Sequence, residues 1–208
     1  NKLSSVELTY FVAACYTNVM TTEETILLTK AMVKHGDVLK LDKYPVVDKH
    51  SIGGIPGNRT TMVVVPIIAA AGYLIPKTSS RSITSPAGTA DTMEVLCKVS
   101  FSISKMKEIV LKTNGCIVWG GSLNLAPADD KIIAVERPLE IDAESQLLAS
   151  IMAKKHSVSS THILIDVPIG KYAKVNNMIE AVKLKKEFEK IGKRLKKHVK
   201  VILTDGKQ

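Results

Sequence analysis

The amino-acid sequence predicts an α/β fold: a mostly parallel sheet with crossover helices, joined to a small all-helical lobe. Two observations favour this fold. From about residue 44, short runs rich in β-branched residues alternate with helical segments, a rhythm typical of parallel sheets with crossover helices. Before that point the pattern of residues predicts a pair of helices, and a further predicted helix interrupts the alternation after residue 123.

The first 40 residues predict two helices, because capping residues stand where the helices would begin. Ser4 or Ser5 suits the N-cap of the first helix. Thr21 and Glu24 have the Thr-x-x-Glu spacing of a capping box, which predicts the start of the second. Gly36 is typical of a helix end.

Three strand–helix units are expected next. The predicted strands are 44–48, 73–76 and 116–120, and the predicted helices are 58–71, 89–95 and 104–112. Pro66 predicts a bend in the first of these helices, and Gly72 predicts its end.

The remaining segments complete both parts of the fold. A Pro-rich loop is expected after residue 123, followed by a helix from 143 to about 156, a strand at 161–170, a Lys-rich helix within 183–200 and a strand at 199–204. The predicted helical lobe is 1–40 joined by about 127–158, and the predicted α/β domain is 44–124 with 159–208.

Composition excludes several classes of protein. The chain has 208 residues, of which 45% are hydrophobic and 24% are charged, an ordinary globular balance. Three cysteines with no Cys-x-x-Cys pair argue against a disulfide framework and a zinc ribbon, and five scattered histidines suggest no metal set. Reduced thiols favour a cytoplasmic location, and no signal peptide pattern is present.

Neither nucleic acid nor a membrane is an expected partner. The net charge of +9 invites a nucleic-acid role, but the lysines crowd into 183–200, where apolar residues at helical spacing favour one solvated helix face. The longest apolar run, 62–76, is too short for a membrane span and contains Pro66 and Gly72.

A first candidate loop is KHSIGGIPGNRTT, residues 49–61. It follows a predicted strand and leads into a predicted helix, whose free N–H groups attract anions. Lys49 adds a charge, and Ser51, Thr60 and Thr61 add hydroxyl groups. The loop matches neither the Walker A pattern nor Gly-x-Gly-x-x-Gly, so it is either an anion site of another kind or a plain tight turn.

A second candidate loop is KTSSRSITSPAGTADT, residues 77–92. It is rich in Ser and Thr, contains Arg81, and ends in Gly88-Thr89 at a predicted helix start. A flexible polar loop is the alternative. Because the ends of neighbouring parallel strands meet at one edge of a sheet, we expect the two loops to face one crevice.

Two further segments carry polar residues with ordinary alternative explanations. Asp142 suits the N-cap of the helix that starts at 143. Ser150 and Lys154 are four residues apart, so they share one helix face, which usually faces solvent. Lys171 and Lys174 flank a turn after a strand, where exposed lysines are common.

Together these segments resemble the thymidine phosphorylase and AMP phosphorylase family. The resemblance rests on VVDKHSIGGIPGN, IPKTSSRSITSPAGTADTMEVL, GCIVWGGSLNLAPADDKI, QLLASIMAKK and LTDGKQ, which cover nearly the whole chain in order. It implies phosphorolysis, in which phosphate attacks the anomeric carbon of a sugar and a base departs. It also implies that the chain is the middle of a longer protein, as does its start without Met.

The resemblance implies a role for individual residues. Asp142 would be the catalytic proton donor to the leaving base. The phosphate-binding residues would be Lys49, Ser51, Gly54, Thr60 and Thr89. The substrate-binding residues would be Gly54, Ser80, Arg81, Ser82, Ile83, Thr84, Ser85, Thr89, Ser150, Lys154 and Lys174.

The resemblance also implies partners. Inorganic phosphate would be the co-substrate, with no other cofactor and no metal, beside a nucleoside monophosphate or a nucleoside. A homodimer or larger homo-oligomer is expected.

The sequence is closer to the AMP phosphorylase branch. Pyrimidine nucleoside phosphorylases carry an Arg fifteen residues before the helix Ser, where this chain has Val135, and Arg137 stands two residues away. Pro86 and Tyr172 stand where small residues are common. The alternatives are a thymidine phosphorylase and a non-catalytic nucleotide-binding module.

Overall fold

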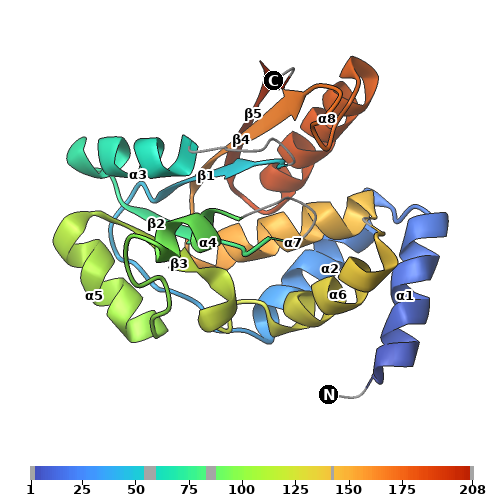
Figure 1. Ribbon diagram of the computed structural model, residues 1–208, viewed down its shortest axis with the longest axis horizontal. Helices are drawn as coiled ribbons and strands as arrows, with labels where there is room; N and C mark the ends of the chain where they lie inside the picture. Colours follow the sequence, from blue (N-terminus) through green and yellow to red (C-terminus); the bar gives the residue numbers. More distant parts are fainter. Residues whose placement is uncertain (1–2, 54–59, 83–87, 142, 207–208) are drawn as a thin grey trace.

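The computed structural model describes residues 3–53, 60–82, 88–141 and 143–206. Its helices are α1 (Ser5–Thr17), α2 (Thr22–Lys34), α3 (Thr60–Ala70), α4 (Thr89–Glu94), α5 (Ile103–Thr113), α6 (Pro127–Leu139), α7 (Glu144–Ser157) and α8 (Met178–Arg194). Its strands are β1 (Val47–Ser51), β2 (Ile75–Ser79), β3 (Gly115–Trp119), β4 (His162–Ile169) and β5 (His198–Asp205) (Figure 1).

The strands form a parallel arrangement in two hydrogen-bonded groups. One group has the order β1-β4-β5 and the other pairs β2 with β3, and all of these pairs are parallel. The groups are joined where the backbone N–H of Val47 donates to the carbonyl of Leu74 at 2.8 Å. The carboxyl ends of the strands therefore point toward one edge, and the predicted α/β fold with a parallel sheet is confirmed.

Local sequence explains where several elements begin and end. Ser4 and Thr21 accept hydrogen bonds from the backbone N–H groups of Glu7 and Glu24, so both N-terminal helices start with a capping box. Asn114, with φ at 62°, adopts the left-handed conformation that ends α5 and leads into β3. Asn177 caps α8, so the basic helix starts several residues before the predicted lysine run.

The structure corrects the expected loop after residue 123. Residues Pro127–Leu139 form the helix α6 instead. The helix tolerates Pro127 because this residue occupies the first turn, where its missing N–H is not needed. Pro138 lies in the last turn, so the two prolines bracket a helix. The N-cap of α7 is Ala143, which makes no side-chain capping bond, and Asp142, the expected N-cap, lies outside the described residues.

The first two predicted strands lie further along the chain than expected. β1 runs from Val47 to Ser51, and β2 runs from Ile75 to Ser79. Pairing with β4 and β3 holds these polar stretches extended. Lys49 and Ser51 are thus strand residues whose side chains have fixed directions.

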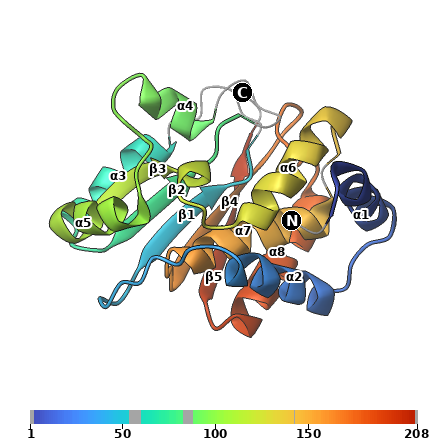
Figure 2. The same cartoon turned by 90° about the horizontal axis from the view of Figure 1, so that it is seen from below.

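Helices cover both faces of the strands (Figures 1 and 2). The helices α1, α2, α6 and α7 share a cluster of buried residues: Val12, Met32, Ile132, Ala149 and Ala153. A larger cluster fills the space between α8, α7 and strands β4 and β5, with Phe188 fully buried. These contacts support the predicted helical lobe, although the division into two domains stays a prediction.

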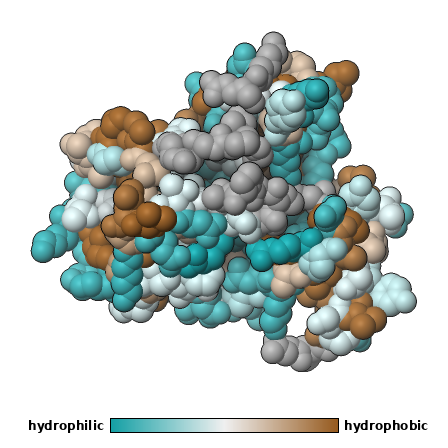
Figure 3. All heavy atoms as spheres, in the orientation of Figure 1, coloured by the Kyte–Doolittle hydropathy of each residue, from teal (hydrophilic) through white to brown (hydrophobic). Residues whose placement is uncertain are grey.

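The surface carries exposed apolar side chains on α3. Val63 is 57% exposed and Ile67 is 60% exposed, and Figure 3 shows apolar residues gathered over this helix. None of the helices in the described ranges is long and apolar enough to cross a membrane.

Leu184→Ala should lower the free energy of unfolding by about 2–5 kcal/mol, because the leucine on α8 is 3% exposed within the largest core cluster. Leu96→Ala is the matched control: Leu96 is 68% exposed, so its truncation should change stability by less than about 0.5 kcal/mol. Urea unfolding followed by circular dichroism measures both. Equal effects would contradict the packing described here.

Candidate functional site

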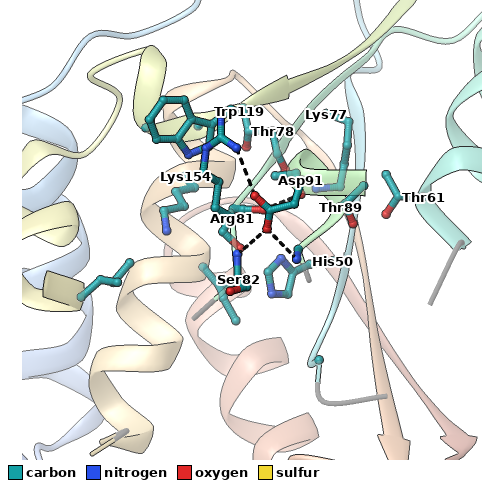
Figure 4. A pocket seen from close by; sticks show the side chains of 18 of the residues that line it. His50, Thr61, Lys77, Thr78, Arg81, Ser82, Thr89, Asp91, Trp119 and Lys154 are labelled. Atoms are coloured by element: carbon teal, nitrogen blue, oxygen red, sulfur yellow. Dashed lines mark hydrogen bonds and ion pairs between the residues drawn. The ribbon is translucent and has the colours of Figure 1, made fainter. Parts of the chain in front are cut away.

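A cavity of about 810 Å³ opens beyond the carboxyl ends of β1, β2 and β3. The strand-end segments 49–51, 77–82 and 119–121 line it on one side, and α6 and α7 line it on the other (Figure 4). Both candidate loops therefore contribute described residues to the same cavity, as the sequence predicts. Ligands commonly bind at this position in open parallel sheets.

Three buried lysines line the cavity, two on the strands and one on α7. Lys49 on β1, Lys77 on β2 and Lys155 on α7 are 4%, 4% and 1% exposed, respectively. We call these three residues the lysine cluster. Buried lysines are rare unless they are paired with an opposite charge.

Asp48 balances one charge of the lysine cluster. Its carboxylate lies 2.9 Å from the Lys155 ammonium, and both side chains are almost completely buried. The carboxylate also accepts hydrogen bonds from the Lys49 backbone N–H at 2.7 Å and from the Ser160 hydroxyl at 3.3 Å. Asp48 thus anchors α7 to β1.

The surroundings of the lysine cluster disfavour positive charge. Burial lowers the pKa of Lys49 to about 8, with a further contribution from Lys155, although Asp166 and Asp48 oppose the shift. Burial and Lys155 hold the pKa of Lys77 well below its usual range. An anion in the cavity would relieve this destabilisation of positive charge.

Burial also keeps His50 neutral. Burial and the neighbouring lysines, Lys155 first among them, hold the pKa of His50 well below its usual range. A neutral imidazole can donate one hydrogen bond and accept another.

Hydroxyl groups surround the cations. Ser51 lines the cavity and donates to the Asp166 carboxylate at 2.8 Å. Thr61, Thr78 and Thr89 line it as well. Lysines combined with hydroxyl donors form an arrangement suited to a phosphate group.

Asp91 on α4 holds both described ends of the second loop. Its carboxylate accepts the backbone N–H of Ser82 at 2.7 Å and that of Gly88 at 2.9 Å (Figure 4). Gly88 is needed there, since a Cβ atom would lie 2.4 Å from the Ser80 carbonyl oxygen. The loop is thereby anchored at the cavity rim.

Arg81 is engaged within the protein. Its guanidinium contacts Glu94 at 2.5 and 2.9 Å and Asp91 at 3.1 Å, and it stacks 4.5 Å from the centre of the Trp119 ring. These contacts fix Arg81 and Trp119 against each other at the cavity wall. The predicted substrate contact of Arg81 stays a prediction.

Ser150 and Lys154 share one helix face, as predicted, but this face meets α6 and not open solvent. Ser150 donates to Asp129 at 2.9 Å, and the Lys154 ammonium lies 2.7 Å from the same carboxylate. Asp129 is buried. Lys154 lines the cavity, whereas Ser150 is not among the lining residues.

The other predicted residues have different positions. Thr60 begins α3, but its neighbour Thr61 lines the cavity. The backbone N–H of Lys174 donates to the Gly53 carbonyl at 3.3 Å, which places the turn after β4 beside the first loop. Burial lowers the pKa of Lys174, and Glu136 opposes the shift. The predicted residues Gly54, Ile83, Thr84, Ser85 and Asp142 lie outside the described residues, as does Pro86.

Several cavity residues were not identified from the sequence. They are His50, Lys77, Trp119, Arg137 and Lys155. The adjacent lysines 154 and 155 and the strand-end position of Lys77 were the available signals. Within the described ranges, no group of three or more His, Cys, Asp and Glu side chains is arranged to hold a metal ion.

Arg137 and Val135 face different parts of the protein. Val135 packs against the buried cluster shared by the helices α1, α2, α6 and α7. Arg137 lines the cavity and donates to the backbone carbonyl of Ser82 at 2.9 Å, so it links α6 to the second loop. The guanidinium that α6 contributes to the cavity is therefore that of Arg137.

Residues 43–186 match the family model described as "Glycosyl transferase family, a/b domain". A "putative thymidine phosphorylase" of Bradyrhizobium diazoefficiens is 58% identical over 91% of this chain and 37% of its own length. The "putative thymidine phosphorylase" of Legionella pneumophila strain Corby is 53% identical over 100% of this chain and 40% of its own length.

An "AMP phosphorylase" of Pyrococcus furiosus is also 53% identical, over 100% of this chain and 41% of its own length. The chain thus spans about two fifths of the length of the curated relatives it matches.

Solved structures share the fold. Anthranilate phosphoribosyltransferase from Saccharomyces cerevisiae, in complex with PRPP and Mg, matches with a TM-score of 0.70 at 17% identity, over 96% of this chain and 52% of that chain. The same enzyme from Thermus thermophilus matches with a TM-score of 0.67 at 16% identity, over 99% of this chain and 64% of that chain.

Asp48→Asn should lower the free energy of unfolding by about 3–5 kcal/mol, because it leaves the buried Lys155 charge without its partner. The matched control is Glu108→Gln, which removes an exposed ion pair with Lys105 and should cost less than about 1 kcal/mol. Chemical denaturation measures both variants. An Asp48→Asn protein as stable as the control would show that the buried pair does not anchor α7.

Proposed function

Because the chain belongs to the glycosyl transferase family whose α/β-domain model matches residues 43–186, we propose that it is the central part of a pentosyl-transferring phosphorylase. The reaction cleaves the N-glycosidic bond of a nucleoside 5′-monophosphate or a nucleoside. Inorganic phosphate is the co-substrate, and the products are a free base and a sugar 1-phosphate. The relatives named AMP phosphorylase and thymidine phosphorylase support this reaction class.

The lysine cluster is the observation that carries the proposal. Three buried lysines and one paired carboxylate leave an excess of positive charge at the cavity wall, facing hydroxyl groups from β1, β2 and α4. A site of this composition binds a phosphate dianion more strongly than a neutral molecule. Lys49, Ser51 and Thr89 are proposed to hold the attacking phosphate.

The opposite wall suits the nucleoside. A phosphate held beside β1 faces α6 and α7 across the cavity, where Lys154 lies. The transition state of glycosyl transfer has oxocarbenium character, which a nearby phosphate anion stabilises. Holding both reactants in one cavity also reduces the entropic cost of their encounter. Asp142 is proposed to protonate the departing base, and Ser150, Lys154 and Lys174 to contact the nucleotide.

A nucleoside monophosphate is the proposed substrate. Val135 stands at the position of the arginine that pyrimidine nucleoside phosphorylases carry, and its side chain packs into the helical core. The alternative, a thymidine phosphorylase, is supported by Arg137, which supplies a guanidinium to the cavity from a position two residues further along α6.

The resemblance implies a homodimer or a larger homo-oligomer, and exposed apolar residues on α1 support this proposal. Val6 is 66% exposed and Tyr10 is 74% exposed on this helix of the proposed lobe.

The full-length protein should release base from AMP, CMP or UMP only when phosphate is present. Asp142→Asn should reduce kcat by about 10²–10⁴-fold, the usual contribution of a general acid. Asp42→Asn, which changes an exposed aspartate, is the control and should leave the rate unchanged. Chromatographic detection of free base, with thymidine tested in parallel, measures each reaction.

Each outcome separates the alternatives. Release from thymidine alone would favour the pyrimidine enzyme and assign the arginine role to Arg137. Binding of phosphate without release of base from any substrate would favour a non-catalytic nucleotide-binding module.

The KM for phosphate should rise above about pH 8. Burial lowers the pKa of Lys49 to about 8, so this side chain loses its positive charge as the pH rises through that value. Phosphate is already a dianion there, and binding weakens because one cation is lost. Lys49→Arg, whose guanidinium stays charged, should move the rise to higher pH. A KM that stays constant from pH 7 to 9.5 would contradict this role.

A further inference from the structure

Asp166 on β4 is a charged residue beside the cavity that the proposed site does not use. It is not among the residues that line the cavity, but its carboxylate contacts Ser51, which is. Strand pairing fixes this contact. Ser51 on β1 lies opposite Asp166 in the parallel ladder, so both side chains leave the same face of the sheet. Thr204 on β5 lies two residues beyond Ile202, the partner of Asp166, and therefore shares that face.

The single proton of the Ser51 hydroxyl is already engaged by Asp166. The Ser51 Oγ lies 2.8 Å from one carboxylate oxygen, and the Thr204 Oγ1 lies 2.6 Å from the other. A carboxylate only accepts hydrogen bonds, so both hydroxyls donate to it. A hydroxyl has one proton and two lone pairs. While this bond is kept, Ser51 can therefore accept a hydrogen bond from a ligand in the cavity but cannot donate one.

Ser51 thus differs from the lysine cluster, whose ammonium groups can donate hydrogen bonds but cannot accept them. A ligand that satisfies both must offer negatively charged oxygens to the lysines and a proton to Ser51. Hydrogen phosphate has both features. Sulfate has a similar shape and the same charge, but it carries no proton at neutral pH. A sulfate oxygen placed against Ser51 would therefore meet a lone pair.

We propose that Ser51 and Asp166 make the anion site selective for hydrogen phosphate over sulfate, with Ser51 as the acceptor of the phosphate proton and Asp166 as the positioning residue behind it. A chain of hydrogen bonds then runs from the phosphate hydroxyl to Ser51 and from Ser51 to Asp166, and each bond strengthens the next. If Ser51 turned to donate to a sulfate, the Asp166 carboxylate would lose this donor beside a second anion. The inference rests on the proposed function, because it takes phosphate as the ligand of the cavity.

Three tetrahedral anions test the selectivity. Titration calorimetry at pH 7 measures the affinity of the full-length protein for phosphate, arsenate and sulfate. Arsenate carries a proton as phosphate does, so both should bind about 10–100-fold more tightly than sulfate, the range expected for one hydrogen bond to a charged group. Sulfate bound as tightly as phosphate would overturn the proposal without the need for any variant.

Two substitutions test whether these residues cause the selectivity. Asp166→Ala releases the Ser51 proton, so the hydroxyl can donate to any of the three anions, and the ratio of phosphate to sulfate affinity should fall about tenfold or more. Ser51→Ala removes the acceptor and should lower the same ratio. The ratio is the readout because Asp166 also opposes the effect of burial, which lowers the pKa of Lys49, and a change in that charge alters the affinity for every anion.

Thr204→Val is the matched control. It removes the other hydroxyl that donates to Asp166 and leaves the Ser51 contact in place, so the wild-type ratio should be kept. A merely structural role of Asp166 would change all three affinities alike, and an Asp166→Ala protein with the wild-type ratio would refute the proposal. Should Asp166→Ala fail to fold, the wild-type ratio in Ser51→Ala would refute it equally.

Base release separates this inference from the proposed function. Phosphorolysis that sulfate inhibits at concentrations near the KM for phosphate would refute the selectivity and leave the proposed reaction intact. Selective binding of phosphate without release of base from any substrate would refute the proposed reaction and leave the roles of Ser51 and Asp166 as described.

Discussion

The ion pair between Lys155 and Asp48 connects the helical side of the molecule to the strands. It joins α7 to β1 in the interior, where the two side chains are almost fully removed from solvent. Residues next to the pair on both elements belong to the site. Lys154 and Ser150 on α7 face Asp129 on α6, and Lys49 and Ser51 on β1 face the cavity. A buried pair of this kind fixes geometry more than it stabilises the fold, since both charges had to be desolvated.

The same pair leaves the remaining lysines only partly compensated. Lys49 and Lys77 lie close to Lys155, which is paired with Asp48, and Asp166 is the further carboxylate that favours the charged form of Lys49. Replacing either lysine by an apolar side chain would suit the interior better in the absence of ligand. The arrangement is therefore understandable as a site that an anion completes. The unfavourable free energy of burying these lysines without a ligand is a consequence of the affinity for that anion.

The sequence predicted features that depend only on residues close together in the chain. The capping box at Thr21 and Glu24 was visible because it involves residues within one turn of chain. Helix α6 was missed because its two prolines resemble loop punctuation until their positions in the first and last turns are known.

Residues of the site were harder to predict when their role depends on distant partners. Lys155 looks like an exposed lysine in a basic run, and only the approach of β1 buries it against Asp48. Asp91 looks like an ordinary first-turn acid of a helix, but its carboxylate joins Ser82 and Gly88. Lys49, Ser51, Arg81 and Thr89 were found because loops after strands point to the same edge of a parallel sheet.

The pairing of β1 with β4 has a consequence for how the chain acquires its site during synthesis. Ser51 lies opposite Asp166, 115 residues later, and the Lys155–Asp48 pair also joins segments distant in sequence. A ribosome therefore exposes β1 long before its partner strand emerges, and the central strand pairing waits for the β4 segment. High contact order of this kind slows folding, because the long connection between the two segments has to close before their contacts can form. The part of the cavity wall where Ser51 donates to Asp166 therefore assembles only after the β4 segment has been translated.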